Sequence, residues 1–203
     1  MKNIKKGFTL VELLIVISLL GAIALIVIAA INPIEQANRA RDTRFKADGA
    51  QLISAIDRYF ATRSEFPWVT EGAGTEYTNE DEFGFVGAGA QAVGLCAADC
   101  DTNGTLINVD ELKPEFRNRD FVQKDATGTD DQKLWIGKSE GSTQSVYACF
   151  IPLSKSIRQK SCTDEKVYTI STSDGTRTAV DVDSCGDTAA NWTDSGWYIC
   201  IPE

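Results

Sequence analysis

The sequence predicts an α+β protein in which a long N-terminal helix precedes a small disulfide-bonded domain with an antiparallel β-sheet. Three features of the 203 residues lead to this fold class. An uncharged apolar run lies near the N-terminus, helical spacing of apolar residues continues after it, and β-branched or aromatic runs alternate with turns in the C-terminal part. A chain of this length forms one or two domains, so a large multidomain machine is excluded.

The N-terminal run is long enough to cross a membrane. The 19 residues 13–31 carry no charge, and a helix of about 20 apolar residues crosses a hydrocarbon core of about 30 Å. A cleavable secretory signal usually has an apolar core of only about 7 to 15 residues, so we interpret this run as retained. Lys2, Lys5 and Lys6 precede it and predict a cytoplasmic N-terminus, with the rest of the chain outside.

One acid, Glu12, lies at the start of the apolar run, where a charge costs roughly 2.5 to 3.5 kcal/mol on insertion scales and therefore needs a partner. Residues 7–12 read Gly-Phe-Thr-Leu-Val-Glu. This segment, with the apolar run after it, resembles the prepilin leader of type IV pilins and type II secretion pseudopilins. The resemblance implies that a prepilin peptidase cuts after Gly7 and methylates the new amine of Phe8, so that residues 1–7 form the leader.

The resemblance also implies how the subunits would assemble. The amine of Phe8 would be largely cationic near neutral pH, since its reference pKa is about 7.7 to 8.0, and it would pair with Glu12 of an adjacent subunit. The implied partners are further copies of the chain, the prepilin peptidase, the pilus assembly platform with its ATPase machinery, and the membrane before assembly. The implied location is a single pass of the inner or cytoplasmic membrane, followed by an extracellular filament.

One continuous helix is expected from Phe8 to about Arg63. Residues 8–31 form its transmembrane and filament-core half, and residues 32–66 form an amphipathic half in which apolar residues recur at helical spacing. Pro33 lacks an amide donor and clashes with the preceding turn, so it should kink or locally open the helix. Pro67 is expected to end it. So long a helix suits stacking with many copies in a filament core, as the resemblance implies.

The exported domain, residues 67–203, divides into an irregular part and a β-rich part. Residues 67–145 are predicted to be loops with few strands, because glycines interrupt short apolar pieces there. Residues 146–203 are predicted to form the antiparallel sheet, from the runs 146–152, 167–172, 177–182 and 196–202. Asp174 and Gly175 supply the turn of a hairpin that joins the two middle runs.

All six cysteines follow the apolar run, so the expected topology places them where disulfides persist. Six cysteines permit fifteen connectivities, and sequence alone does not fix the pairing. The hairpin turn would bring Cys162 nearly opposite Cys185. Similar strand sequences surround Cys149 and Cys200, which would then lie side by side, and Cys96 and Cys100 remain as a local pair. A zinc site is the alternative use, but the chain has no histidine and no Cys-x-x-Cys spacing.

One acidic segment has the spacing of an EF-hand-type calcium loop. Calcium requires hard oxygen ligands at alternating positions with a glycine at the sharp turn, and Gly104 occupies that position. Ile107 stands where a polar residue usually helps coordinate, so a plain turn is an equal interpretation. The candidate ligands are Asp99, Asp101, Asn103, Thr105 and Asp110. No other cofactor is expected.

Charge and composition exclude several classes of function. Residues 1–63 have a formal balance of +4 and residues 64–203 a balance of −13, so a broad nucleic-acid-binding surface is not expected. The absence of histidine removes the commonest general base and metal ligand, and we expect no enzymatic activity. The expected function is that of a structural subunit of a type IV pilus-like filament. A major pseudopilin of a type II secretion system and a membrane-anchored extracellular binding domain are the alternatives.

Overall fold

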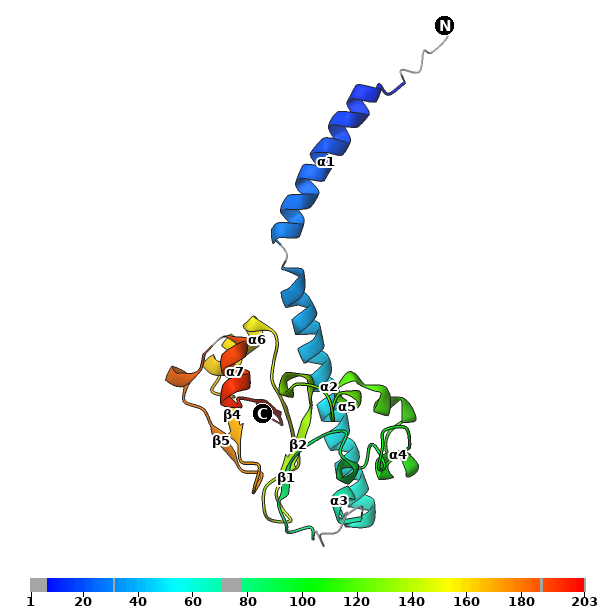
Figure 1. The fold of residues 1–203 in the computed structure, drawn as a ribbon, viewed down its shortest axis with the longest axis vertical. Helices are drawn as coiled ribbons and strands as arrows, with labels where there is room; N and C mark the ends of the chain where they lie inside the picture. The colour runs from blue at the N-terminus through cyan, green and yellow to red at the C-terminus, as the bar shows by residue number, and fades with distance from the viewer. Residues whose placement is uncertain (1–6, 31, 71–77, 187, 203) are drawn as a thin grey trace. The chain divides into compact units, whose positions relative to one another are not determined.

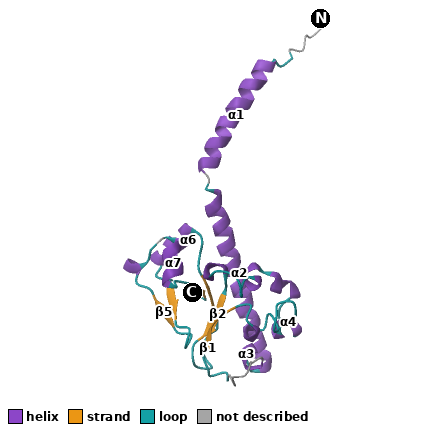
Figure 2. Ribbon diagram, in the orientation of Figure 1, coloured by secondary structure: helices purple, strands orange, loops and turns teal. Residues whose placement is uncertain are grey.

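The structure is a computed structural model that describes residues 7–30, 32–70, 78–186 and 188–202. The chain divides into two compact units, Met1–Ala37 and Asn38–Glu203. The elements are shown by chain position in Figure 1 and by type in Figure 2. In order they are α1 (Leu10–Ala30), α2 (Pro33–Arg63), α3 (Pro67–Thr70), β1 (Phe83–Gly87), η1 (Gln91–Val93), α4 (Thr105–Asn108), η2 (Pro114–Asn118), α5 (Asp120–Gln123), η3 (Asp130–Gln132), β2 (Trp135–Lys138), β3 (Tyr147–Phe150), α6 (Lys155–Thr163), β4 (Tyr168–Ile170), β5 (Arg177–Ala179), η4 (Val182–Ser184), α7 (Ala189–Ser195) and β6 (Ile199–Ile201).

Helix α1 is apolar on every side and buries none of its described side chains. Every residue from Gly7 to Ile28 is exposed, and the least exposed large apolar side chain of this stretch, Val16, is still 43% accessible. The stretch Leu10–Ile28 is long and apolar enough to cross a membrane. A helix that is hydrophobic all round belongs in a membrane or in a large core, so α1 fits a membrane anchor.

The expected helix is interrupted before Pro33, where a kink or local opening was predicted, so α1 and α2 are two helices and not one continuous helix. Helix α1 ends at Ala30 and α2 begins at Pro33, while Ile31 lies outside the described residues. The side-chain oxygen of Asn32 accepts a hydrogen bond from the Glu35 amide at 3.2 Å, which is the contact of an N-cap residue. Proline is favoured at the first helical position, because its missing amide would have no helical partner there. Asn32 and Pro33 together therefore start a new helix.

Within the second unit, α2 packs one face against the sheet. At Gly49 the helix lies close to the strands, since a Cβ atom there would lie 3.1 Å from Ile201 Cδ1 and 3.3 Å from Ala148 Cβ. A larger side chain at this position would push the helix away from β3 and β6. The buried apolar residues of α2 lie on one face of the helix and are Phe45, Leu52, Ile53, Ala55, Ile56 and Tyr59.

The main sheet is antiparallel with the strand order β1-β2-β3-β6. Strands β3 and β6 lie within the predicted runs 146–152 and 196–202. The part expected to be loops with few strands, residues 67–145, supplies β1 and β2, so the main sheet extends beyond the predicted range 146–203. Both strands are short and contain glycine, and β2 ends in a lysine, so neither has the composition from which a strand is recognised.

The lysine that ends β2, Lys138, is fully buried. Its ammonium donates hydrogen bonds to the backbone oxygens of Asp81 at 3.0 Å and Ser139 at 3.2 Å, and it lies 5.6 Å from the centre of the Phe66 ring. Burial lowers the pKa of Lys138, and the carboxylates of Glu80–Glu82 act in the opposite direction. The two carbonyl oxygens make a core position tolerable for a cation.

The predicted hairpin is present as a second, two-stranded sheet of β4 and β5. Gly175 in its turn has φ +63°, and Asp174 Oδ1 accepts a hydrogen bond from the Thr176 amide at 2.9 Å. A Cβ atom on Gly175 would lie 2.8 Å from the Lys138 oxygen, so the turn requires glycine for its position as well as its backbone angle. The buried Tyr147 hydroxyl donates to the Gly175 oxygen and ties the hairpin to β3.

A stack of four aromatic rings joins the end of α2 to α3 and β1. Phe60 and Phe66 have ring centres 4.4 Å apart, Phe66 and Trp68 4.6 Å, and Trp68 and Phe83 4.2 Å. Trp68 is fully buried.

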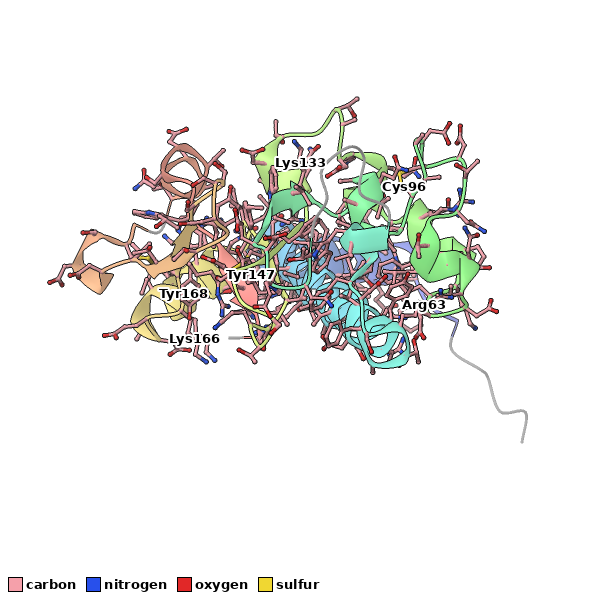
Figure 3. All side chains as sticks on the ribbon, turned by 90° about the horizontal axis from the view of Figure 1, so that it is seen from below. Arg63, Cys96, Lys133, Tyr147, Lys166 and Tyr168 are labelled. Carbon is pink, nitrogen blue, oxygen red and sulfur yellow. A yellow bond between two sulfur atoms is a disulfide. The ribbon has the colours of Figure 1, made fainter. Side chains whose placement is uncertain are left out.

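In Figure 3 Arg63 and Cys96 lie on one side of the second unit, and Lys166 and Tyr168 lie on the other. The main sheet and α2 therefore separate the segment around Cys96 from the hairpin.

The structure has three disulfides with the same pairs as the sequence analysis: Cys96–Cys100, Cys149–Cys200 and Cys162–Cys185. Cys149 and Cys200 are directly paired residues of the neighbouring strands β3 and β6. This bridge closes a loop with a sequence separation of 51, whereas Cys96 and Cys100 are separated by only 4. A bridge that closes a longer loop removes more entropy from the unfolded chain. The Cys149–Cys200 bridge should therefore stabilise the fold more than the Cys96–Cys100 bridge does.

Removal of the Cys149–Cys200 bridge is therefore expected to have the larger effect. In the chain-entropy description, replacing both cysteines with alanine should lower the free energy of unfolding by roughly 4 kcal/mol, against roughly 2 kcal/mol for the Cys96–Cys100 pair. Chemical unfolding of the detergent-solubilised full chain would measure both values. Equal losses from the two double variants would contradict the dependence on loop length.

Candidate processing and assembly site

The three described residues before α1, Gly7 to Thr9, are exposed and not helical. Gly7, Phe8 and Thr9 precede the first helical residue, Leu10, and the Phe8 side chain is 79% accessible. A Cβ atom added to Gly7 would meet nothing within 4 Å. No contact in the described structure therefore requires a glycine at position 7. The bond between Gly7 and Phe8 lies where a peptidase could reach an extended chain.

Thr9 and Glu12 hold the start of α1 through a capping box, which the sequence analysis missed. The Glu12 amide donates to Thr9 Oγ1 at 3.2 Å, and Glu12 Oε2 accepts hydrogen bonds from the Thr9 amide at 2.9 Å and the Thr9 hydroxyl at 2.7 Å. The signal was available, since Thr9 followed three residues later by glutamate is the pattern of such a box. Glu12 thus has hydrogen-bond partners within its own subunit, both of which donate to Oε2 and leave its charge.

The predicted pair between Glu12 and the amine of Phe8 in another subunit stays a prediction. The chain described here is uncut, so the nitrogen of Phe8 belongs to a peptide bond. The pair needs the cut after Gly7, which frees that nitrogen as a cation. Phe8 lies directly before Thr9 and is exposed at the N-terminal end of α1. The amine that the cut would free therefore lies next to the start of the helix.

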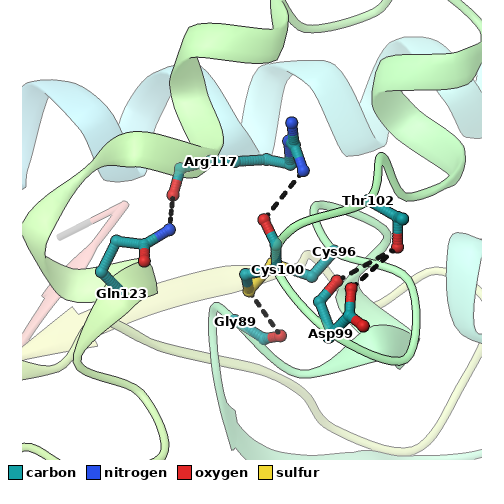
Figure 4. The surroundings of a disulfide bond; sticks show 7 residues. All are labelled: Gly89, Cys96, Asp99, Cys100, Thr102, Arg117 and Gln123. Atoms are coloured by element: carbon teal, nitrogen blue, oxygen red, sulfur yellow. Dashed lines mark hydrogen bonds between the residues drawn. A yellow bond between two sulfur atoms is a disulfide. The ribbon is translucent and has the colours of Figure 1, made fainter.

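The predicted calcium ligands do not form a cation site in this structure. Among the residues that the structure describes, no three Asp, Glu, His or Cys side chains come close enough to hold a metal. Asp99 Oδ1 instead accepts a hydrogen bond from the Thr102 hydroxyl at 3.1 Å (Figure 4). Thr105 is buried at the start of α4. Asp110 lies beyond α4 with φ +61°.

The local backbone explains why the EF-hand spacing does not give EF-hand geometry. The Cys96–Cys100 bridge closes the chain within the segment, and Arg117 donates to the Cys100 oxygen at 2.8 Å (Figure 4). Gly104 is pressed against the backbone of Gly94, so that a Cβ atom on Gly104 would lie 2.5 Å from the Gly94 carbonyl. These contacts form a tight turn, and calcium binding would require the segment to rearrange. Calcium binding stays a prediction that the geometry does not favour.

A calcium titration is expected to leave the melting temperature of the full chain unchanged. The reason is that the candidate carboxylates do not come together in the structure. Asp101→Ala removes an exposed carboxylate and serves as the matched control. Millimolar calcium should be compared with chelator, because extracellular sites of this type bind weakly. A rise in wild type that Asp101→Ala lacks would show that the segment rearranges around the ion; 100 Kd of calcium would add about 2.7 kcal/mol.

Comparison with known families addresses the N-terminal segment. The family model described as the prokaryotic N-terminal methylation motif matches residues 2–28. This range contains Gly7, Phe8 and Glu12 together with the apolar helix Leu10–Ile28. The N-terminal segment therefore matches the leader of type IV pilins and pseudopilins. No solved structure matches the chain.

The type IV pilin-like leader accounts for the features that the fold alone leaves unexplained. It explains a glycine at position 7 that no neighbour demands and an anchor helix with apolar residues on all sides. The rest of the chain fits the same α+β fold, with an antiparallel sheet and disulfides in a small domain after the helix. The motif belongs to structural proteins of the pilin type, which suggests that this chain is not an enzyme.

Proposed function

We propose that this chain is the structural subunit of a type IV pilus-like extracellular filament. Prepilin peptidase would cut after Gly7 and methylate Phe8, and α1 would hold the subunit in the membrane until it joins the filament. The observation that carries the proposal is the match of residues 2–28 to the methylation motif, directly on a helix that buries none of its described side chains. The second unit has its own aromatic and aliphatic core, so α1 is not needed to complete it.

The composition of α1 supports packing between copies of the chain. Gly21 lies inside the helix with nothing within 4 Å of a Cβ position, although glycine destabilises a helix interior by roughly 0.5 to 1 kcal/mol relative to alanine. Small residues in membrane helices allow a second helix to approach closely. A neighbouring α1 would make use of Gly21 and cover the exposed leucine, isoleucine and valine side chains around it.

A major pseudopilin of a type II secretion system is the second candidate, because the same leader occurs in both kinds of subunit. Such a filament would stay short and periplasmic. Three disulfides in the second unit suit either compartment, since both are oxidising. The assembly platform, its ATPase machinery and the prepilin peptidase are proposed partners in both cases.

Electron microscopy of cells with and without the gene for this chain would test the proposal. We expect surface filaments that disappear with the gene, and mass spectrometry of sheared filaments should show a chain that begins with methylated Phe8. Loss of protein secretion without loss of surface filaments would favour the pseudopilin. An uncut chain that remains in the membrane and forms no filament would favour an anchored binding domain.

A further inference from the structure

The second unit is acidic but contains a pocket lined mainly by cations. Residues 38–203 include 17 Lys/Arg and 27 Asp/Glu. Helices α2 and α6 and the strands β3 and β6 nevertheless enclose a cavity of about 400 Å³ that is lined by four cationic side chains and only two acidic ones. We call this cavity the basic pocket, and its cations are Arg39, Lys46, Lys160 and Lys166.

The two acidic residues of the basic pocket already have local contacts. The buried carboxylate of Asp42 accepts hydrogen bonds from the Leu153 amide at 3.1 Å and the Ser154 amide at 2.8 Å, and Arg41 approaches it to 2.9 Å. Asp164 lies 3.8 Å from Lys160. The pocket keeps a positive excess, because two carboxylates face four cations.

The basic pocket combines this charge with an apolar floor and a fixed rim. Phe150, Ile157 and Ile199 line its inner wall. The Arg39 guanidinium donates a hydrogen bond to Ser156 Oγ at 2.7 Å, which holds it between α2 and α6. A ligand that fits must therefore carry negative charge toward the rim. An acidic loop with short side chains has that chemistry.

An acidic cluster, residues 80–82, lies at the opposite end of the unit. Asn79 next to it contacts the end of α2, accepting a hydrogen bond from the Phe66 amide at 3.3 Å and donating one to the Ser64 oxygen at 2.7 Å. The basic pocket lies beside the α2 residues 39–46 instead. The distance along the helix from Lys46 to Ser64 is roughly 27 Å, at about 1.5 Å per residue. Figure 1 agrees, since α6 lies beside the earlier part of this stretch of α2 and the chain enters β1 beside its end.

The acidic cluster is held in place by hydrogen bonds. Glu80 is exposed, and its Oε2 accepts a hydrogen bond from the Ser142 amide at 3.1 Å. Hydrogen bonds with Ser142 hold the pKa of Glu80 below its usual range. Asp81 Oδ2 accepts a hydrogen bond from the Thr78 amide at 2.6 Å, and buried Lys138 holds the Asp81 backbone oxygen. The cluster is therefore a fixed anionic surface.

We propose that the acidic cluster Glu80–Glu82 of one subunit docks into the basic pocket of a second copy of this chain. Subunits that point the same way along an axis meet through unlike ends, so such a contact repeats from copy to copy and builds an open filament. The inference rests on the proposed filament and adds the contact that selects the neighbour. Opposite charges on the two ends attract correct neighbours, and like ends repel.

Charge reversal in the full chain would test the contact in cells. Lys46→Glu with Lys160→Glu should lower the mass of filaments by about tenfold or more, and Glu80→Lys with Glu82→Lys should do the same; tenfold corresponds to only about 1.4 kcal/mol per contact. The chain with all four substitutions should recover filaments, because each contact is again between opposite charges. Co-expression of the two double variants should also recover them, with the two chains mixed in one filament. Lys113→Glu with Lys124→Glu, both exposed outside the basic pocket, is the control of equal net charge and should assemble normally.

The outcomes separate this contact from the proposed function. Normal filaments from either double variant, or no recovery by the fourfold variant, would overturn the contact while leaving the filament. A wild-type chain that forms no filaments would overturn the proposed function and the contact with it. An anionic lipid is the other occupant that the basic pocket could take. Full-chain binding to vesicles with phosphatidylglycerol that requires Lys46 and Lys160, together with normal filaments from the variant at 80 and 82, would assign the pocket to lipid and overturn the proposal.

Discussion

Replacement of Glu12 by alanine is expected to leave the chain in the membrane and to abolish filaments. Insertion should improve slightly, because the substitution removes a charge whose insertion costs roughly 2.5 to 3.5 kcal/mol. Assembly should fail, because the amine of Phe8 would enter a low-dielectric helix bundle without its partner. Breaking a buried ion pair by removing one member costs about 3 to 5 kcal/mol, which is more than a hundredfold in an association constant. Membrane fractionation and the mass of sheared filaments would measure the two effects.

Two further variants separate the charge of Glu12 from its role in the capping box. Glu12→Gln keeps an oxygen that can accept the Thr9 amide, but it loses the charge, so it should assemble as poorly as Glu12→Ala. Thr9→Val keeps the charge and removes the hydroxyl contacts at 2.7 and 3.2 Å. Loss of an N-cap costs about 0.5 to 2 kcal/mol at one helix end, so this variant should still form filaments. Filaments from Glu12→Gln and none from Thr9→Val would assign Glu12 to the helix start alone.

The parts of the fold that the sequence predicted correctly depend on local patterns. The apolar stretch identifies α1 by its length alone, and the Asp174–Gly175 turn identifies the hairpin of β4 and β5 because it needs a positive φ at the glycine. The pairing of Cys149 with Cys200 depended on two similar strand sequences, which the structure places directly opposite each other. In each case the residues that determine the structure are close in sequence or alike.

The parts that the sequence did not predict depend on contacts between distant residues. Strand β1 pairs with β2 although Phe83 and Lys138 are far apart in the chain, and neither strand is recognisable without its neighbour. From its residue type alone, Lys138 would be placed on the surface. In the structure its ammonium contacts the backbone oxygens of Asp81 and Ser139. For this reason the main sheet was predicted only within residues 146–203.

The candidate site shows the same division between local and distant causes. The leader that contains Gly7 and Glu12 is recognised from its local sequence, and the family model matches it. The spacing of the candidate calcium ligands is also a local pattern. The path of that segment, however, is set by a disulfide and by the close approach of Gly104 to Gly94. Ligand spacing specifies a metal site only when the backbone between the ligands is free to follow it.

The second large effect is expected from Gly7→Val, which should block maturation without disturbing the fold. The structure predicts no clash, because nothing lies within 4 Å of a Cβ position at residue 7. The chain should then keep its first seven residues, which include Lys2, Lys5 and Lys6, and intact-mass measurement of the membrane fraction would show the unprocessed, unmethylated form. Gly21→Ala, at a glycine inside α1 that also has nothing within 4 Å of its Cβ position, is the control and should be processed normally.

Filament yield from Gly7→Val connects this experiment with the one on Glu12. An uncut chain has a peptide bond at Phe8 instead of a cationic amine, so Glu12 would lack its partner in a neighbouring subunit, and no filaments should form. A mature Phe8 terminus in Gly7→Val would show that the glycine does not direct the cut. Filaments built from the uncut chain would show that assembly does not need the amine. The capping box with Thr9 would then be the remaining role for Glu12 in α1.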